Sequence, residues 1–388
     1  MSSRRHGIAV GAAAAIAIAV GVALTSAATP GTAGHPTSAI GTIAPTTGTA
    51  ADNLRTRAVA ATLPRRAQVL AGLRRAGNYW IATHPDPGAN NWREAVMLHG
   101  YLTAHATVGD ALFINYARRW AGNNAFGLHG GPLTHNPDDQ VSGRVYLDLD
   151  GDRPNSVDLS QIMSSVDEMV RNGADNEWWW VDALYMGMPV FAQLGVVENE
   201  PSFVDKAYAM YHNTKSVRGL YSKTAHLWSR DQRHRGVFWS RGNGWAFAAL
   251  ADVLTALPGN TAHRADYRTT FQQMAAALAA AQRPDGFWNT DLGDPSHFGG
   301  PESSGTSLFT YGLAWGIRHG VLSRAKYLPV LIKAWHALST VALHSNGLVG
   351  YVQPEGGTPA PSTPNHTADY GVGVFLLAAS AVAELAPQ

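Results

Sequence analysis

Helical periodicity is the feature that most constrains the fold of this chain of 388 residues. From about residue 63 onward, apolar side chains recur at three-and-four spacing in one segment after another, which is typical of helices with one buried face. Strand patterns are sparse and fall in connections, as in 236–239 and 347–352. We place the helix starts near residues 63, 91, 108, 138, 157, 179, 201, 243, 262, 304, 325 and 370.

Twelve such helices predict an all-α fold, an (α/α)6 barrel of six helical hairpins. The alternative is an open helical solenoid, which would show a sequence repeat of fixed length. No such repeat is present in this chain.

Alternate helices begin with clusters of polar and aromatic residues, whereas the helices between them begin without such clusters. Capping explains the Asp, Asn, Ser and Thr residues of these clusters, but not their tryptophans and glycines. We therefore expect the six marked helices to form an inner ring whose N-termini meet at one end and favour an anionic ligand. The clusters are Asn90-Asn-Trp-Arg-Glu94, His135-Asn-Pro-Asp-Asp-Gln140, Trp178-Trp-Trp-Val-Asp182, Arg241-Gly-Asn-Gly-Trp245, Glu302-Ser-Ser-Gly-Thr306 and Thr367-Ala-Asp-Tyr-Gly371.

The N-terminus has the pattern of an export signal. Arg4 and Arg5 precede an apolar run from 8 to 24, and small residues suited to cleavage follow. We expect a cleaved signal over 1–28, a secreted protein and no stable membrane association, rather than a transmembrane anchor; Ser3-Arg4-Arg5 is compatible with twin-arginine export. Residues 29–60 are rich in Thr, Ala, Gly and Pro and predict a disordered linker, which leaves 61–388 as the (α/α)6-barrel domain.

Charge and cysteine content narrow the classes of partner and chemistry. The formal net charge is +1, which gives no reason to expect nucleic acid or an anionic membrane as a partner. There is no cysteine, so disulfides and thiol catalysis are excluded. The sixteen histidines are scattered without metal-ligand spacing, so no metal or other cofactor is expected.

Asp182 is the leading candidate for a catalytic acid. It follows three consecutive tryptophans, 178–180, and precedes Tyr185 and Met186. A carboxyl in apolar surroundings tends to stay protonated, because burial disfavours its charged form, and it can then donate a proton near neutral pH. The alternative is a core helix in which the aspartate only caps or pairs.

A second carboxylate comes from Asp138 or Asp139. Two adjacent aspartates exceed what one helix cap needs. Two carboxylates across a pocket are the usual apparatus of glycoside hydrolysis, so either could partner Asp182.

The segment from Trp239 to Trp245 is a candidate sugar site. Arg241 offers a planar fork that can clamp a carboxylate, and Trp239 and Trp245 could wall a sugar ring around Asn243. The alternative is a loop-to-helix junction with a surface arginine. His226 could donate a hydrogen bond to the same substrate, although an ordinary loop histidine is an equally good interpretation.

These motifs together resemble glycoside hydrolase family 105, the unsaturated rhamnogalacturonyl hydrolases, which are related to the family 88 unsaturated glucuronyl hydrolases. The resemblance runs in order from about residue 90 to the C-terminus. The motifs that carry it are Trp180-Val-Asp182 with Ala183-Leu-Tyr-Met186, Phe238-Trp-Ser-Arg-Gly-Asn-Gly-Trp245, Pro284-Asp-Gly-Phe-Trp288, Glu302-Ser-Ser-Gly-Thr306, Tyr311-Gly-Leu-Ala-Trp-Gly316, Gly350-Tyr-Val-Gln-Pro354 and Tyr370-Gly-Val-Gly373.

The resemblance implies an (α/α)6 barrel that acts, without a cofactor, on oligosaccharides ending in a 4,5-unsaturated uronic acid, of the kind left by lyases on pectic rhamnogalacturonan. It implies that an aspartate protonates C4, that water adds at C5, and that the resulting hemiketal opens. By position, Asp182 would be the proton donor and the base that activates water, and Asp138 the second aspartate, with Asp139 as the fallback. Residues matching the family's substrate pocket are Trp180, Trp239, Arg241 and His226.

The chain also departs from the family pattern. Residues 148–154 are rich in Asp, and the Tyr-containing helical hairpin expected there is missing from the pattern. Position 171 is Arg where some relatives have His. These departures leave two alternatives open: a conventional glycosidase such as an α-mannanase, or a barrel that binds carbohydrate without catalysis.

Overall fold

The computed structural model describes residues 62–388, and the predicted export signal and linker lie outside them. In the described residues the regular structure is helical, apart from isolated β-bridges. Two of the bridges, Trp239 with Asp291 and Leu343 with Val349, lie in the connections where the sequence showed strand patterns. No helix of this part of the chain is long and apolar enough to cross a bilayer.

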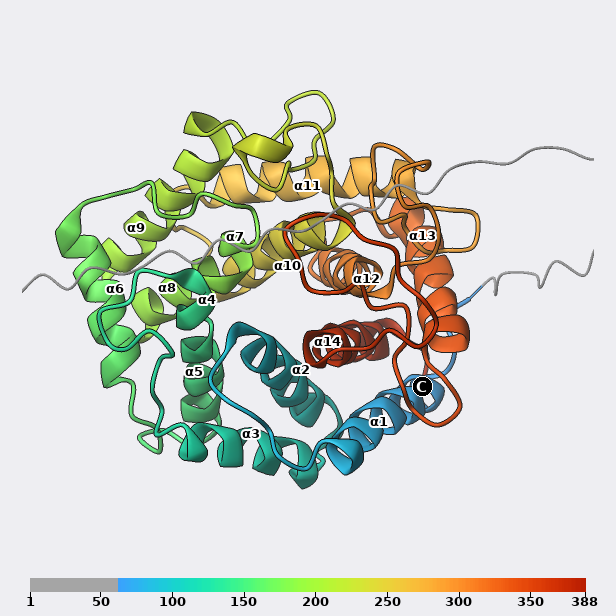
Figure 1. The fold of residues 1–388 in the computed structure, drawn as a ribbon, viewed down its shortest axis with the longest axis horizontal. Coiled ribbons are helices and arrows are strands. Elements are labelled where there is room, and N and C mark those ends of the chain that lie inside the picture. Colours follow the sequence, from blue (N-terminus) through green and yellow to red (C-terminus); the bar gives the residue numbers. More distant parts are fainter. Residues whose placement is uncertain (1–61) are drawn as a thin grey trace, which may run out of the picture. The chain divides into compact units, whose positions relative to one another are not determined.

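Six helices form a closed inner ring (Figure 1). They are α2 (Trp92–Val108), α5 (Ser142–Asp152), α8 (Met188–Val197), α10 (Ser240–Ala256), α12 (Ser303–Arg318) and α14 (Asp369–Leu385). Each packs against the next along the chain, and α14 packs against α2. Because the last inner helix contacts the first, the ring excludes an open solenoid and confirms the predicted barrel.

Six outer helices alternate with the inner ones along the chain and surround them (Figure 1). They are α1 (Arg66–Thr83), α3 (Ala111–Asn123), α6 (Ser160–Asn172), α9 (Pro201–His212), α11 (Arg264–Ala281) and α13 (Arg324–Ala337). Two four-residue helices, α4 (Pro137–Gln140) and α7 (Ala183–Met186), lead into α5 and α8. Each predicted start falls within four residues of an observed one, but 138 and 179 fall at the short helices α4 and α7, and the inner helix α8 begins nine residues after 179, at Met188.

Three short irregular helices complete the described part. Two π-helical segments, η1 (Asn213–Val217) and η3 (Leu338–Ala342), continue α9 and α13. A 3-10 turn, η2 (Gln232–His234), lies in the connection between α9 and α10.

The prediction that the stretch after Asp138 lacks a Tyr-containing helical hairpin is wrong. Helices α5 and α6 form that hairpin, and Tyr146 is buried within α5. Both helices were predicted, near 138 and 157, but the acidic residues obscured the family pattern, because Asp148 stands where an apolar residue would continue the buried face. In the structure its carboxylate is paired with His99 at 2.7 Å, which makes its burial tolerable.

Helices α2 and α14 approach so closely that their backbones touch. A Cβ atom on Gly100 of α2 would overlap the carbonyl oxygen of Gly373 in α14, and one on Gly373 would overlap the backbone of Met97. Only glycine lets two helices come this near without displacing one of them. The contact that closes the ring therefore depends on these two glycines.

We expect Gly100→Ala to lower the free energy of unfolding by about 1–3 kcal/mol, because the added methyl group overpacks a rigid backbone contact. Chemical denaturation with circular dichroism would measure this. Gly122→Ala on α3 is the matched control, since nothing lies within 4 Å of an added Cβ there, and it should not destabilise the protein. Equal effects of the two substitutions would contradict the interpretation of the α2–α14 contact.

Candidate active site

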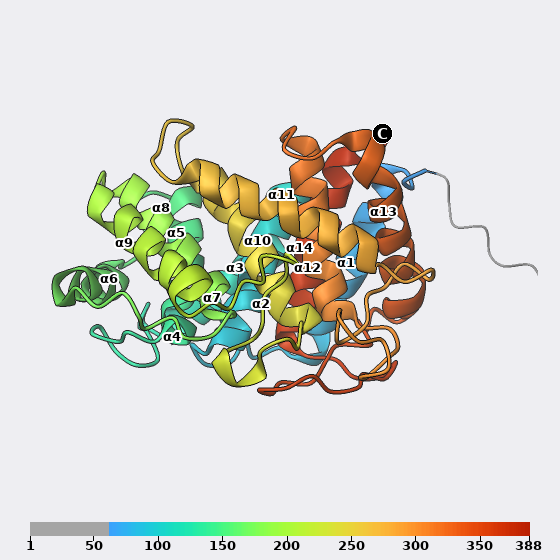
Figure 2. The same cartoon turned by 90° about the horizontal axis from the view of Figure 1, so that it is seen from above.

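The clusters that mark alternate helices lie at the N-terminal ends of the inner ring, and a cavity of about 270 Å³ opens there. Figure 2 shows the short helices α4 and α7 on the same side of the ring as the long connections of its last third. Four of the six clusters contribute directly to the cavity wall. The cavity is lined by Trp92, Asp138, Trp180, Asp182, Met186, Arg230, Arg241, Trp245, Glu355, Gly356 and Gly357.

Asp182 occupies the N-cap position of α7 but does not use its side chain as a cap. Its Oδ1 atom is buried and has no hydrogen-bond partner. Burial raises the pKa of Asp182 above the ordinary value, and the positive charges of Arg241 and Arg230 oppose part of that rise. The structure thus favours the protonated form of this carboxyl at the wall of a cavity.

Asp138 lines the same cavity from the first turn of α4. Asn136 caps this turn, because its Oδ1 accepts the Asp138 N–H at 3.1 Å, and this leaves the Asp138 carboxyl free. Burial, together with the negative charges of Asp182 and Asp139, raises the pKa of Asp138 to about 7. The cavity therefore holds two carboxyls whose protonation is coupled.

Asp139, the fallback candidate, is placed differently. It is buried outside the cavity lining, and its carboxylate accepts a hydrogen bond from the Thr134 hydroxyl at 2.7 Å. It anchors the loop before α4, so the structure assigns the two neighbouring aspartates to different tasks.

Arg241 joins the cavity to the loop that leads to Glu355. Its guanidinium lies 4.3 Å from the ring centre of Trp239, and Nη1 donates to the carbonyl oxygens of Gln353 at 2.7 Å and Pro354 at 2.9 Å. The Trp239 indole N–H donates to the Gln353 side chain. Trp239 therefore supports Arg241 from behind, whereas Arg241 itself lines the cavity.

Besides Asp139 and Trp239, two further predicted site residues do not line the cavity. Asn243 is fully buried, with Oδ1 accepting the Trp228 N–H at 2.7 Å and Nδ2 donating to the Trp228 carbonyl at 2.9 Å. These bonds occupy the amide in a structural role. His226 lies in a turn with a φ of 56° beside Tyr221 and is not among the lining residues.

Other cavity residues were not predicted as site residues. Trp92 belonged to the first marked cluster, and Arg230 lay four residues after His226, so both had some signal in the sequence. Glu355 directly follows the Gly350-Tyr-Val-Gln-Pro354 motif, but nothing in that motif marks its carboxylate as a site group. It is held by an ion pair with Arg93 at 2.8 Å.

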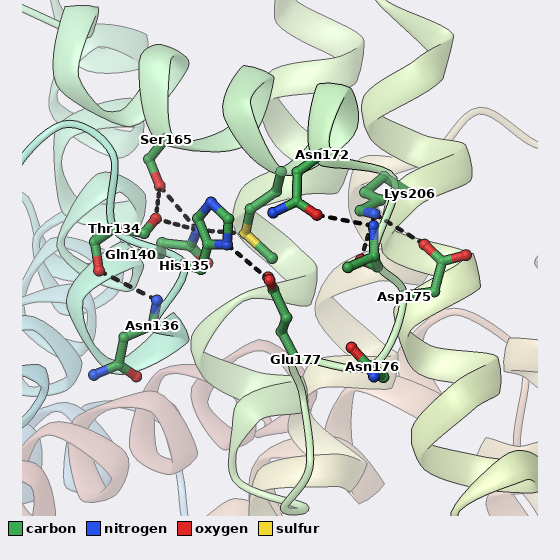
Figure 3. A network of polar contacts seen from close by, with 12 residues as sticks. Thr134, His135, Asn136, Gln140, Ser165, Asn172, Asp175, Asn176, Glu177 and Lys206 are labelled. Atoms are coloured by element: carbon green, nitrogen blue, oxygen red, sulfur yellow. Dashed lines mark hydrogen bonds and ion pairs between the residues drawn. The ribbon is translucent and has the colours of Figure 1, made fainter.

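A hydrogen-bond network links the two segments that carry the aspartates (Figure 3). His135, three residues before Asp138, bonds through Nδ1 to the Glu177 carboxylate at 2.7 Å, and Glu177 lies five residues before Asp182. The 173–182 connection is further fixed by Lys206, whose ammonium donates to the Ala174 carbonyl at 2.6 Å. The His135–Glu177 bond therefore ties the segment before Asp138 to the segment before Asp182.

Residues 62–388 contain no group of three or more His or acidic side chains that could hold a metal ion. The side chains of the cavity themselves supply two carboxyls with raised pKa values, two guanidinium groups and three indole rings. Such a set of groups can exchange protons and can bind an anionic ligand.

Proteins similar to this chain agree with the chemistry that the cavity residues suggest. The model of a family described as Glycosyl Hydrolase Family 88 matches residues 73–386. The chain is 32% identical over 336 residues to an unsaturated 3S-rhamnoglycuronyl hydrolase of Formosa agariphila, a match that covers 79% of this chain and 88% of that protein.

Solved structures show the same similarity. A glycosyl hydrolase family 88 protein from Bacteroides vulgatus is 32% identical with a TM-score of 0.76, over 82% of this chain and 99% of that one. A protein described as a polysaccharide lyase is 33% identical with a TM-score of 0.76, over 82% and 98%. A possible family 105 member from Salmonella enterica, 19% identical with a TM-score of 0.70 over 89% and 100%, shares the fold.

We expect Asp182→Asn to lower the pKa of Asp138 from about 7, because residue 182 can then no longer ionise and ionisation of Asp182 is one cause of the raised value. Carbon-13 NMR titration of the aspartate carboxyls would measure the change. Asp294→Asn, at an exposed position, is the control and should leave the titration of Asp138 as it is. An unchanged pKa of Asp138 in Asp182→Asn would show that the two carboxyls are not coupled.

Proposed function

Since this chain belongs to glycosyl hydrolase family 88, we propose that it removes a 4,5-unsaturated uronic acid from the non-reducing end of oligosaccharides made by polysaccharide lyases. The observation that carries the proposal is the pairing of Asp182, whose buried Oδ1 has no partner, with two arginines at one cavity. A protonated acid beside a site for an anion is what this reaction requires. The chain itself is a hydrolase by its family.

In the proposed mechanism, protonated Asp182 donates its proton to C4 of the C4=C5 double bond. The positive charge that develops at C5 is shared with the ring oxygen and is stabilised by the carboxylate of Asp138. Asp182, now ionised, takes a proton from the water that adds at C5. The product is a hemiketal, which opens and breaks the link to the next sugar without displacement at the anomeric carbon.

Two guanidinium groups support recognition of the uronate carboxylate. Arg230 and Arg241 both line the cavity, and charge-assisted bonds from arginine to carboxylate are among the strong hydrogen bonds in proteins. The tryptophans of the wall give flat apolar faces for the ring. A volume of about 270 Å³ lies below the range of roughly 300–1,000 Å³ for drug-sized ligands, so the cavity suits one terminal sugar.

The name of the Formosa agariphila relative supports a rhamnose after the uronate. We therefore place rhamnose, with or without a 3-sulfate, as the leaving sugar; the pectic rhamnogalacturonan expected from the sequence also carries rhamnose after its uronate. Turnover of matched unsaturated disaccharides with rhamnose, sulfated rhamnose and glucosamine as the second sugar would rank these substrates.

A second candidate function is lyase action, because one protein of similar structure is described as a polysaccharide lyase. The two activities have opposite signatures. A hydrolase of the proposed kind consumes the conjugated double bond, so ultraviolet absorbance falls as the neighbouring sugar is released. A lyase creates such bonds in an intact polysaccharide, so absorbance rises, and that result would replace the hydrolase proposal.

We expect Asp182→Asn to reduce turnover of unsaturated oligosaccharides by at least about 10²–10⁴-fold, the usual contribution of a general acid. Binding measured by calorimetry and the circular dichroism spectrum should stay close to those of the wild type. Asp175→Asn, in the network before Asp182 but outside the cavity, is the control and should retain turnover. Near-normal turnover by Asp182→Asn would remove the central assignment.

Arg230→Ala should raise KM, because the uronate loses a charged partner, and should also move the pH profile. The charge of Arg230 lowers the pKa of both Asp182 and Asp138. A proton donor is active below its pKa and inactive above it, so loss of Arg230 should shift the alkaline limb of kcat to higher pH. A shift to lower pH, or an unchanged KM and profile, would place the carboxylate elsewhere.

A further inference from the structure

A second cavity, of about 660 Å³, lies at the opposite end of the inner ring. Its lining comes mainly from the C-terminal halves of α2, α5, α8 and α10, whereas the first cavity is lined from the N-terminal ends of the inner helices and from connections. The two cavities share no lining residue. The function proposed for the first cavity therefore does not explain the presence of the second cavity.

Three buried polar side chains form what we call the floor of the second cavity. His99, Arg144 and Asp252 line it, and their exposed fractions are 7%, 4% and 6%. Arg144 Nη1 donates to Asp252 Oδ2 at 2.7 Å, and the Tyr311 hydroxyl donates to Asp252 Oδ1 at 2.5 Å. His99 Nδ1 bonds to Asp148 Oδ2 at 2.7 Å. Each basic group of the floor thus has a carboxylate partner.

The pairing of basic groups with carboxylates limits the charge that a ligand of this cavity can carry. Burial of an ion without a counter-charge is strongly unfavourable. Because Arg144 is paired with Asp252 and Asp148 Oδ2 is bonded to His99, an ion would have to displace an existing partner at the floor. A neutral polar group fits there.

Gln193 supplies the group that such a ligand can meet. Its Nε2 donates to Asp148 Oδ1 at a long 3.4 Å, and its Oε1 is buried without a partner. Within the described residues, the amide is therefore weakly held and leaves part of its hydrogen-bonding capacity unsatisfied. After rotation it can accept from and donate to one neutral group that carries both a donor and an acceptor.

The residues of the cavity walls indicate the chemical nature of the apolar part of the ligand. They are largely aliphatic, with Leu102, Ile114, Leu147 and Pro189 among them, and no tryptophan or phenylalanine lines the cavity. The first cavity, in contrast, has three tryptophans for a sugar ring. An alkyl chain suits the second cavity better than a sugar.

We propose that this second cavity is a binding site for a neutral aliphatic molecule that ends in a hydroxyl or carboxamide group. The polar end bonds the Gln193 amide at the floor, and the alkyl chain lies along the aliphatic walls. The site is separate from the proposed active site and does not depend on the hydrolase proposal.

The test is isothermal titration calorimetry of the intact protein with four six-carbon probes of matched length. We expect 1-hexanol and hexanamide to bind at least about tenfold more tightly than hexanoate and hexylammonium. Preference for hexanamide over hexanol would identify the carboxamide as the better end group. Equal or tighter binding of either ion, or no binding of both neutral probes, would overturn the proposal.

Two variants test whether the probes bind in the second cavity. A Cβ on Gly151, which lines the cavity, meets nothing within 4 Å, so Gly151→Phe can fill the cavity without a clash. Gln193→Leu keeps the size of the side chain and removes the amide. Each should weaken binding of the neutral probes at least about tenfold.

Gly122→Phe on α3, where an added Cβ also meets nothing within 4 Å, is the matched control and should bind the probes like the wild type. Wild-type binding by both cavity variants would overturn the proposal. Binding that is lost in Asp182→Asn instead would assign the probes to the first cavity and would overturn it equally.

Discussion

Two inner helices of this protein, α10 and α14, are buried along nearly their whole length, and much of the structure follows from that constraint. In α10 every residue from Ser240 to Leu254 is buried, and in α14 every residue from Tyr370 to Ala383 is buried. A helix without a solvent-facing side can present its residues to a ligand only at its ends. Polar groups along its length must instead find partners inside the protein, as Asp252 does with Arg144 and Tyr311.

The two ends of the ring are chemically different. At the N-terminal ends, two arginines meet two carboxyls with raised pKa values, which suits an anion and proton transfer. At the opposite end, the charges are already paired and the walls are aliphatic. Tyr185 separates the two: its ring lies 4.7 Å from that of Trp245 at the first cavity and 5.4 Å from the guanidinium carbon of Arg144 at the second.

The sequence allowed prediction of the helices, their alternation and the end of the ring where polar clusters meet, because helical periodicity and helix starts are local properties. The sequence was less informative about the direction in which each side chain points. Arg241 and Asn243 stand two residues apart in one motif, yet successive residues of a helix point about 100° apart, so one faces the cavity and the other faces Trp228. Glu355 escaped prediction because its position depends on contacts made by a connection far along the chain.

The contact between Gly100 and Gly373 also determines when the barrel can be completed. It joins the first inner helix to the last, so it pairs residues near the two ends of the described chain. While the ribosome is still adding α13, α2 has no neighbour on one side and its apolar surface stays open to solvent or chaperones. Ring closure is therefore a late, non-local event in synthesis, of the kind that slows folding and exposes intermediates to aggregation.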